Sequence, residues 1–232
     1  MEIVKEFSRF AHEYNKYNVI QKEVAKRLVS YIPKGLYHKI LDLGSGDGAI
    51  YKALNYSNIE FDKFVAFDFS KEMLKIHPEN DNIEKICMDF NQLNSFSIFK
   101  KDEFDLLISS SALQWSRDLL SILTTIAPLA KEHYFAFFTS NTFKTLHQTV
   151  NIDSPIYSRD EITKALDKVF SYEMEIVEYS LDFNSVYEML KYIKRSGVGG
   201  GTEHLSYKKM KYLLENYPLK YLEFEVLFVK SI

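Results

Sequence analysis

The sequence predicts a doubly wound α/β fold with a mostly parallel sheet, an antiparallel edge strand and a helical cap insertion. Three observations support this prediction. Short apolar runs alternate with helical patterns, which is typical of parallel strands joined by crossover helices. A glycine-rich turn directly follows the first of these runs. The last third of the chain instead holds two longer segments that could pair antiparallel.

The composition is that of one globular domain, which we expect to span residues 1–232. Hydrophobic residues make up 46% of the chain and charged residues 26%, so a full-sized core is available. The formal net charge is −3, whereas general nucleic-acid binders are usually basic. The single cysteine excludes an internal disulfide and a four-thiolate zinc site. We expect Cys87 to be a small, buried strand residue.

Two amphipathic helices are predicted within residues 1–34, before the first strand. Apolar residues recur there at helical spacing, at Phe7, Phe10, Ala11 and Tyr14 and again at Ile20, Val24, Leu28 and Tyr31. Charges at Glu2, Lys5, Glu6 and Arg9 interrupt any stretch of signal-peptide length. No apolar run approaches the roughly 20 residues that a membrane span needs. We therefore expect a cytoplasmic protein that binds neither membranes nor nucleic acids.

The predicted strands follow in order along the chain. Five apolar runs should form parallel strands at 40–43, 64–67, 83–88, 104–109 and 134–139. Ser158 and Glu161 form a capping-box pair that should open a helix ending near residue 170. Segments 172–182 and 221–229 are expected to pair antiparallel at the sheet edge. Between them, residues 184–218 hold two helical patterns, which indicates a lid or substrate-binding cap.

A strand runs directly into the glycine turn from Asp42 to Gly48. Glycine at such a turn lets the backbone approach a ligand closely, so a nucleotide-like ligand is implied. Gly44, Gly46 and Ala49 also fit the dinucleotide fingerprint loosely, which leaves a nicotinamide enzyme and an S-adenosylmethionine enzyme open. Asp42 favours the S-adenosylmethionine enzyme, because a carboxylate facing the ligand suits an ammonium group better than a pyrophosphate.

Further acids follow the next two strands. Asp68 lies about 20 residues beyond Gly46, where a carboxylate that binds a ribose diol is expected. Met73 offers a polarizable thioether for an adenine face, and Asp89 could accept from the adenine amine. Each also has a structural alternative, with Asp68 capping a helix, Met73 in the core and Asp89 in a turn. Taken together, the set favours a ligand site.

These residues resemble the class I S-adenosylmethionine-dependent methyltransferases, which implies a Rossmann-like sheet. More closely, the chain resembles the malonyl-acyl-carrier-protein O-methyltransferase family of biotin synthesis (the BioC family). Matching segments are 7–14 with Gln21, 109–115, 138–139 with 146–148, 160–162, Lys194 with Gly197, and 217–219. Ser45 stands where this family often has cysteine, and Gly199–Gly201 are additional glycines in the cap.

The resemblance implies methyl transfer from S-adenosylmethionine to the free carboxylate of malonyl-acyl carrier protein. The product would be the methyl ester that primes biotin precursor synthesis. The motif residues and the resemblance together give one predicted cofactor-binding set. This set is Asp42, Gly44, Ser45, Gly46, Asp68, Phe69, Met73, Asp89, Phe90 and Ser109.

A carboxylate is already ionised at neutral pH, so the reaction needs no general base. Catalysis should come from in-line positioning and from replacing water around the carboxylate. Lys194 is the first candidate to orient the carboxylate. Other candidates that could line the cleft are Tyr14, Tyr17, Gln114, Trp115 and His147. We expect no metal, because the six histidines form no cluster with ligand spacing.

Other functions stay open at this point. A methyltransferase for a free small acid or a quinone precursor would share the cofactor half of the chain but not the cap. A non-catalytic S-adenosylmethionine-binding protein would show binding without ester formation. A nicotinamide oxidoreductase is a more distant alternative, and it would bind NAD more tightly than S-adenosylhomocysteine.

Overall fold

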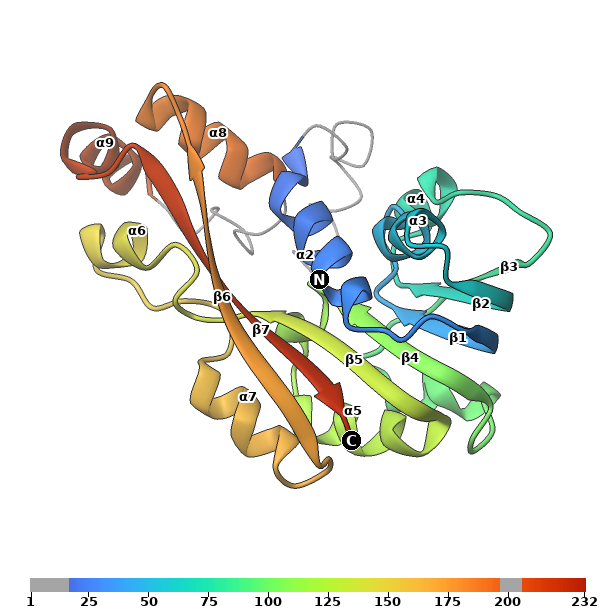
Figure 1. The fold of residues 1–232 in the computed structure, drawn as a ribbon. Helices are drawn as coiled ribbons and strands as arrows, with labels where there is room; N and C mark the ends of the chain where they lie inside the picture. The colour runs from blue at the N-terminus through green and yellow to red at the C-terminus, as the bar shows by residue number, and fades with distance from the viewer. Residues whose placement is uncertain (1–16, 197–205) are drawn as a thin grey trace.

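A computed structural model describes residues 17–196 and 206–232. Its strands form a single seven-stranded sheet in the order β3-β2-β1-β4-β5-β7-β6 (Figure 1). The strands are β1 Leu36–Leu43, β2 Glu60–Asp68, β3 Ile83–Cys87, β4 Phe104–Ser110, β5 Ala130–Phe138, β6 Tyr172–Asp182 and β7 Tyr221–Ser231.

The helices connect and cover these strands. The α-helices are α2 Val19–Ser30, α3 Ala49–Tyr56, α4 Lys71–Ile76, α5 Leu119–Ile126, α6 Lys144–Thr149, α7 Arg159–Leu166, α8 Val186–Ser196 and α9 Tyr207–Asn216. Short 3-10 helices are η1 Leu93–Ile98, η2 Leu113–Trp115 and η3 Ala127–Leu129. Of the helices in the two described ranges, none is long and apolar enough to cross a bilayer.

Strands β1 to β5 are mutually parallel, and β7 runs antiparallel to both of its neighbours. From β1 the chain proceeds outward through β2 to β3, then returns to place β4 on the other side of β1. The gap between β1 and β4 is therefore the topological switch point. In open α/β sheets, ligands bind outside the carboxyl ends of the strands at such a point.

The sheet separates two apolar cores because successive strand residues point to opposite faces. Ile40 and Phe64 pack on the face covered by α2, α3, α4 and α8 (Figure 1). Their neighbours Leu41 and Val65 pack on the opposite face, under η1, α5 and α7. With all four side chains fully buried, the parallel strands are apolar on both faces, as the short uninterrupted runs predicted.

The predicted fold class is confirmed, including the antiparallel pairing of 172–182 with the last strand. The antiparallel strand β7 lies one position in from the edge, and β6 is the outermost strand. Ser158 and Glu161 form the predicted capping box, although α7 ends at Leu166 rather than near residue 170. Two helices, α8 and α9, occupy segment 184–218 as predicted. The predicted helix around Phe7–Tyr14 lies outside the described residues, as do Gly197 and Gly199–Gly201.

Cys87 is a correction to the sequence analysis, which expected it to be buried. The structure places Cys87 at the carboxyl end of β3 with its side chain exposed. Strand β3 is the other outermost strand of the sheet, and its burial is only partial along its length. The Cys87 thiol donates to the carbonyl oxygen of Phe69 at 3.5 Å.

Candidate functional site

The glycine turn after β1 is held in a conformation that favours glycine. Gly44, Gly46 and Gly48 have φ angles of 77°, 53° and 80°. The backbone N–H of Gly44 donates to the carbonyl of Phe67 at the end of β2, at 2.8 Å. A Cβ atom on Gly44 would lie 2.3 Å from the Cβ of Ala112. The turn therefore lies directly against the loop that follows β4.

Asp68 ends β2 and fixes the turn from the neighbouring strand. Its Oδ2 accepts from the N–H of Gly46 at 2.9 Å, and its Oδ1 accepts from the N–H of Ser70 at 2.8 Å. Ser70 in turn caps α4 by accepting from the N–H of Met73 at 3.2 Å. Burial raises the pKa of Asp68 to about 6, although both N–H donors oppose that shift. Asp68 is thus a structural residue of the turn as well as a residue of the pocket.

Asp42 is only 1% exposed, and neither carboxylate oxygen has a hydrogen-bond partner among the described residues. Burial raises its pKa well above the ordinary value, and the nearby charges of Asp68 and Asp47 raise it further. An unpaired buried carboxyl is costly and rare in native proteins. The arrangement therefore calls for a ligand that brings hydrogen-bond donors or positive charge.

A third acid, Asp47, lies within the turn and connects it to α2. Its Oδ2 accepts from the amide nitrogen of Asn18 at 3.1 Å, just before α2 begins. The ammonium of Lys52 lies 3.5 Å from the same carboxylate. Asn18 is fully buried, so this contact fixes the start of α2 over the glycine turn.

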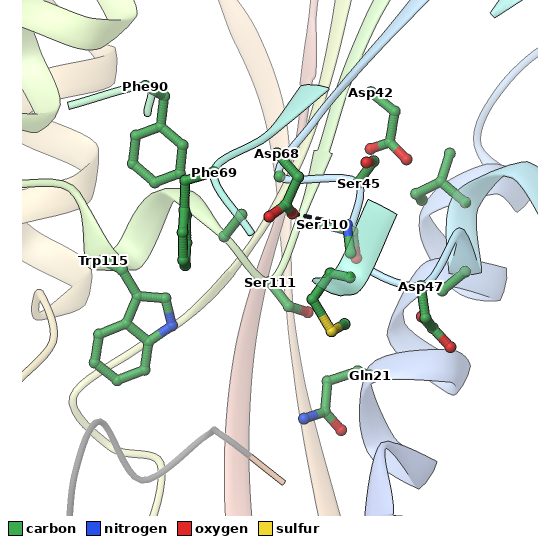
Figure 2. Close-up of a pocket in the computed structure, with 16 residues that line it drawn as sticks. Gln21, Asp42, Ser45, Asp47, Asp68, Phe69, Phe90, Ser110, Ser111 and Trp115 are labelled. Carbon is green, nitrogen blue, oxygen red and sulfur yellow. Dashed lines mark hydrogen bonds between the residues drawn. The ribbon is translucent and has the colours of Figure 1, made fainter. Parts of the chain in front are cut away.

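The turn, the acids and the loop after β4 enclose a pocket with an empty volume of about 740 Å³, part of it open to solvent. In Figure 2, Phe69, Phe90 and Trp115 lie on one side of this pocket, and Asp42, Asp47 and Gln21 lie on the other. The pocket therefore combines an aromatic wall, which suits a planar ring, with an acidic wall, which suits positive charge or hydroxyl groups.

Most of the predicted cofactor-binding residues line this pocket. They are Asp42, Gly44, Ser45, Gly46, Asp68, Phe69, Met73 and Phe90. Asp89 and Ser109 lie beside the pocket instead of in its lining. The Oδ1 of Asp89 accepts from the N–H of Asn91 at 2.9 Å, which is the turn contact expected as the structural alternative for this residue. The hydroxyl of Ser109 donates to the carbonyl of Leu43 at 2.7 Å and ties β4 to β1.

The predicted acceptor-orienting residues are more scattered. Trp115 lines the pocket. Gln114 is buried with its Oε1 atom unpartnered among the described residues, but it lies outside the lining. The Tyr17 hydroxyl accepts from the guanidinium of Arg195 at 2.8 Å, a contact between the residue before the α2 cap and α8. Tyr14 and the side chain of Lys194 lie outside the described residues.

His147 differs from the prediction. It lies on α6 and lines a separate hollow together with Lys144, Gln148 and Ser154. Helix α6 follows β5, and Phe143, in a left-handed conformation with φ of 59°, immediately precedes the helix. His147 is not among the described residues that line the pocket at the glycine turn. Burial lowers the pKa of His147.

Several lining residues were not singled out as site residues from the sequence. They are Gln21, Asp47, Ala49, Ile50, Ser110, Ser111 and Ala112. For Gln21 a signal existed, because it is a polar residue beside Ile20 and Val24 on the apolar stripe of a predicted helix. Ser110 and Ser111 follow a predicted strand, but the sequence does not show which way their hydroxyls point. Within the two described ranges, no group of three or more potential metal ligands is found.

Comparison with known proteins adds a family and several relatives. The family model described as "Methyltransferase domain" matches residues 37–194. A malonyl-[acyl-carrier protein] O-methyltransferase from Bacillus cytotoxicus is 31% identical over 157 residues, which cover 62% of this chain and 52% of that protein. One from Neorickettsia risticii is 25% identical over 209 residues, which cover 84% of this chain and 81% of that protein. The chain thus matches about half the length of the first of these relatives.

Solved structures share the fold. The YcgJ protein from Bacillus subtilis superimposes with a TM-score of 0.65 at 14% identity, covering 90% of this chain and 97% of that one. A SAM-dependent methyltransferase from Archaeoglobus fulgidus gives a TM-score of 0.59 at 15% identity, covering 94% and 96%. The likeness confirms the doubly wound sheet.

Proposed function

The chain belongs to the methyltransferase domain family, and from that premise we propose that it methylates the free carboxylate of malonyl-acyl carrier protein. The methyl donor would be S-adenosylmethionine, and the product would be the methyl ester that primes biotin precursor synthesis. The relatives from Bacillus cytotoxicus and Neorickettsia risticii bear the name of this activity, which supports the choice of acceptor.

The observation that carries the proposal is the buried acidic wall at the switch point of the sheet. Neither carboxylate oxygen of Asp42 has a partner in residues 17–196 and 206–232, so a bound ammonium group would supply the missing donors and charge. Asp68 uses one acceptor position on each oxygen for a backbone N–H. A carboxylate oxygen accepts more than one hydrogen bond, so capacity remains for the two hydroxyls of a ribose.

The aromatic wall suits the other end of the same ligand. Phe69 and Phe90 offer apolar ring surfaces, and Met73 adds a thioether that is buried behind Gly46. The residues present therefore fit S-adenosylmethionine at its amino-acid, ribose and adenine parts. When bound, this group supplies an electrophilic methyl on a positively charged sulfur.

The residues of this chain would contribute position and environment. A carboxylate acceptor loses no proton on becoming a neutral ester, so the reaction requires no general base. The close contact between Gly44 and Ala112 holds the loop after β4 against the turn, which brings the acceptor side of the pocket beside the cofactor side. Such fixed placement can supply much of the rate enhancement in a displacement reaction.

Mass spectrometry of malonyl-acyl carrier protein tests the proposal. After incubation with enzyme and S-adenosylmethionine, the carrier should gain the mass of one methylene unit, and mild base should remove it. Malonyl-coenzyme A and free malonate are the comparison acceptors. Faster methylation of either one would reassign the substrate, and binding of S-adenosylhomocysteine without any ester product would indicate a non-catalytic binding protein.

A further inference from the structure

Two serine hydroxyls in the pocket lining have no hydrogen-bond partner within the part of the chain that the structure describes. Ser110 ends β4 and Ser111 follows it directly, and both line the pocket. Their Oγ atoms are buried, and neither has a hydrogen-bond partner among the described residues. Building on the proposed function, we propose that the Ser110 and Ser111 hydroxyls hold and orient the acceptor carboxylate.

The charge of the pocket makes such donors necessary. The described side chains that line it include the carboxyls of Asp42, Asp47 and Asp68, and no lysine, arginine or histidine. A carboxylate acceptor in this lining therefore depends on neutral N–H and O–H donors. A serine hydroxyl can rotate to donate to a carboxylate oxygen. In Figure 2 the Ser111 hydroxyl lies between Trp115 and Gln21, on the side of the pocket away from Asp42.

The backbone at Ser111 supports a use for its side chain. Ser111 has a φ of 59°, in the left-handed region that favours glycine. Its N–H donates to the carbonyl of Ala136 at 2.9 Å, which holds this conformation in place. Glycine would adopt the same backbone with less strain. A strained residue other than glycine on a pocket wall is typical of a functional site.

The serines also lie in a suitable place along the pocket. Ala112, the next residue, lies against Gly44 of the turn that would bind the cofactor. Trp115 lies a few residues further along the same loop, and its indole nitrogen faces the pocket in Figure 2. The loop after β4 thus places its donors between the acidic wall and the aromatic wall. An acceptor carboxylate bound there would lie next to the cofactor subsite.

The substitution Ser111→Gly tests the inference, because it removes the hydroxyl and relieves the backbone. We expect the free energy of unfolding to stay the same or rise. The KM for malonyl-acyl carrier protein should rise about tenfold or more, as for the loss of a hydrogen bond to a charged group. The affinity for S-adenosylhomocysteine should stay within about twofold of the wild type. A purely structural role for Ser111 would not separate these quantities in this way.

Two further variants complete the design. Ser111→Asn keeps a hydrogen-bond donor and tolerates the left-handed backbone, so its KM should lie closer to the wild type than that of Ser111→Gly. Asn58→Gly is the matched control, because Asn58 has a φ of 53° and lies exposed after α3, away from the pocket. Its KM should not change. Ser110→Ala should raise the KM in the same direction as Ser111→Gly.

The outcomes separate this inference from the proposed function. Suppose that the wild type methylates malonyl-acyl carrier protein, and that Ser111→Gly and Ser110→Ala have the same KM for this carrier as the wild type. The serines then do not bind the acceptor. If Ser111→Gly instead weakens the binding of S-adenosylhomocysteine, the hydroxyl belongs to the cofactor subsite and the inference is wrong. If the wild type leaves the carrier unmodified, the proposed function fails and the inference fails with it.

Discussion

Asp42 and Asp68 lie at the ends of neighbouring strands, and burying each carboxyl in the pocket costs free energy of folding. Both are buried, and burial raises the pKa of both carboxyls. In the ligand-free protein, the two groups therefore favour protonation more than exposed carboxyls do. A cationic ligand would reverse this preference, so ligand binding and proton binding should compete at these residues.

This competition gives a pH prediction. The pKa of Asp68 is about 6 in the folded chain and has the ordinary value of 3.8 in the unfolded chain. Its stabilising contribution is therefore present below about pH 4 and is lost as the pH rises through 6. Affinity for S-adenosylhomocysteine should change in the opposite direction and increase from pH 5.5 to 7.5. Calorimetry at several pH values would measure both the affinity and the protons released.

The variant Asp68→Asn isolates this effect. It should weaken S-adenosylhomocysteine binding by about 1–3 kcal/mol, because charge-assisted hydrogen bonds are lost. It should also flatten the pH dependence near 6. Asp81→Asn, at an exposed carboxyl in the turn before β3, is the control and should leave both unchanged. Equal affinity in folded Asp68→Asn would show that Asp68 only supports the turn.

At the scale of the elements, the glycine turn after β1 lies in close contact with the loop after β4. Gly44→Ala would combine a φ of 77° with a Cβ atom only 2.3 Å from the Cβ of Ala112. We expect it to lower the free energy of unfolding by at least about 2 kcal/mol. Urea denaturation would measure this change.

Two comparisons make the glycine prediction specific. Gly35→Ala introduces a methyl group with no heavy atom of the described residues within 4 Å, so its effect should stay within about 0.5 kcal/mol. Adding Ala112→Gly to Gly44→Ala should recover part of the lost stability, because the overlap is removed and only the backbone strain remains. Additive effects of the two substitutions would contradict direct contact.

The elements themselves were largely predictable because their signals are local. Apolar runs bounded by turn residues gave the five parallel strands, and the Ser158–Glu161 pair gave the start of α7. Most of the glycine-turn residues were predictable because strand ends in a parallel sheet meet at one edge. The directions of side chains in the loops could not be predicted from the sequence. Ser111 lines the pocket, whereas His147 lines a separate hollow. The left-handed backbone at Ser111 and at Phe143 is held by hydrogen bonds to other strands, which the local sequence does not show.

At the scale of the whole molecule, charge should set the order in which ligands bind. The chain has a net charge of −3, and the described lining of the pocket holds three of its carboxyls and no lysine, arginine or histidine. Above about pH 6, where Asp68 is ionised, an anionic acceptor would be repelled from the ligand-free pocket. A cationic cofactor bound first would offset that repulsion.

We therefore predict that malonyl-acyl carrier protein binds several-fold more tightly after the cofactor site is filled with a cationic, non-transferring analogue such as sinefungin. S-adenosylhomocysteine, which lacks the positive charge on sulfur, should have a smaller effect. Calorimetric titration of the carrier into each complex would measure the difference, and high salt should reduce it. Equal affinity for the carrier in the ligand-free protein, the sinefungin complex and the S-adenosylhomocysteine complex would show that charge does not set the binding order.

The chain also carries its own attachment point for an optical reporter. Cys87 is the only cysteine in the sequence, its side chain is exposed, and its sulfur lies 3.5 Å from the backbone of Phe69 at the aromatic wall. A maleimide dye should therefore react at this one position without any engineered thiol. Its emission should respond when a nucleoside fills the crevice, which would allow occupancy to be followed in real time in a stopped-flow instrument.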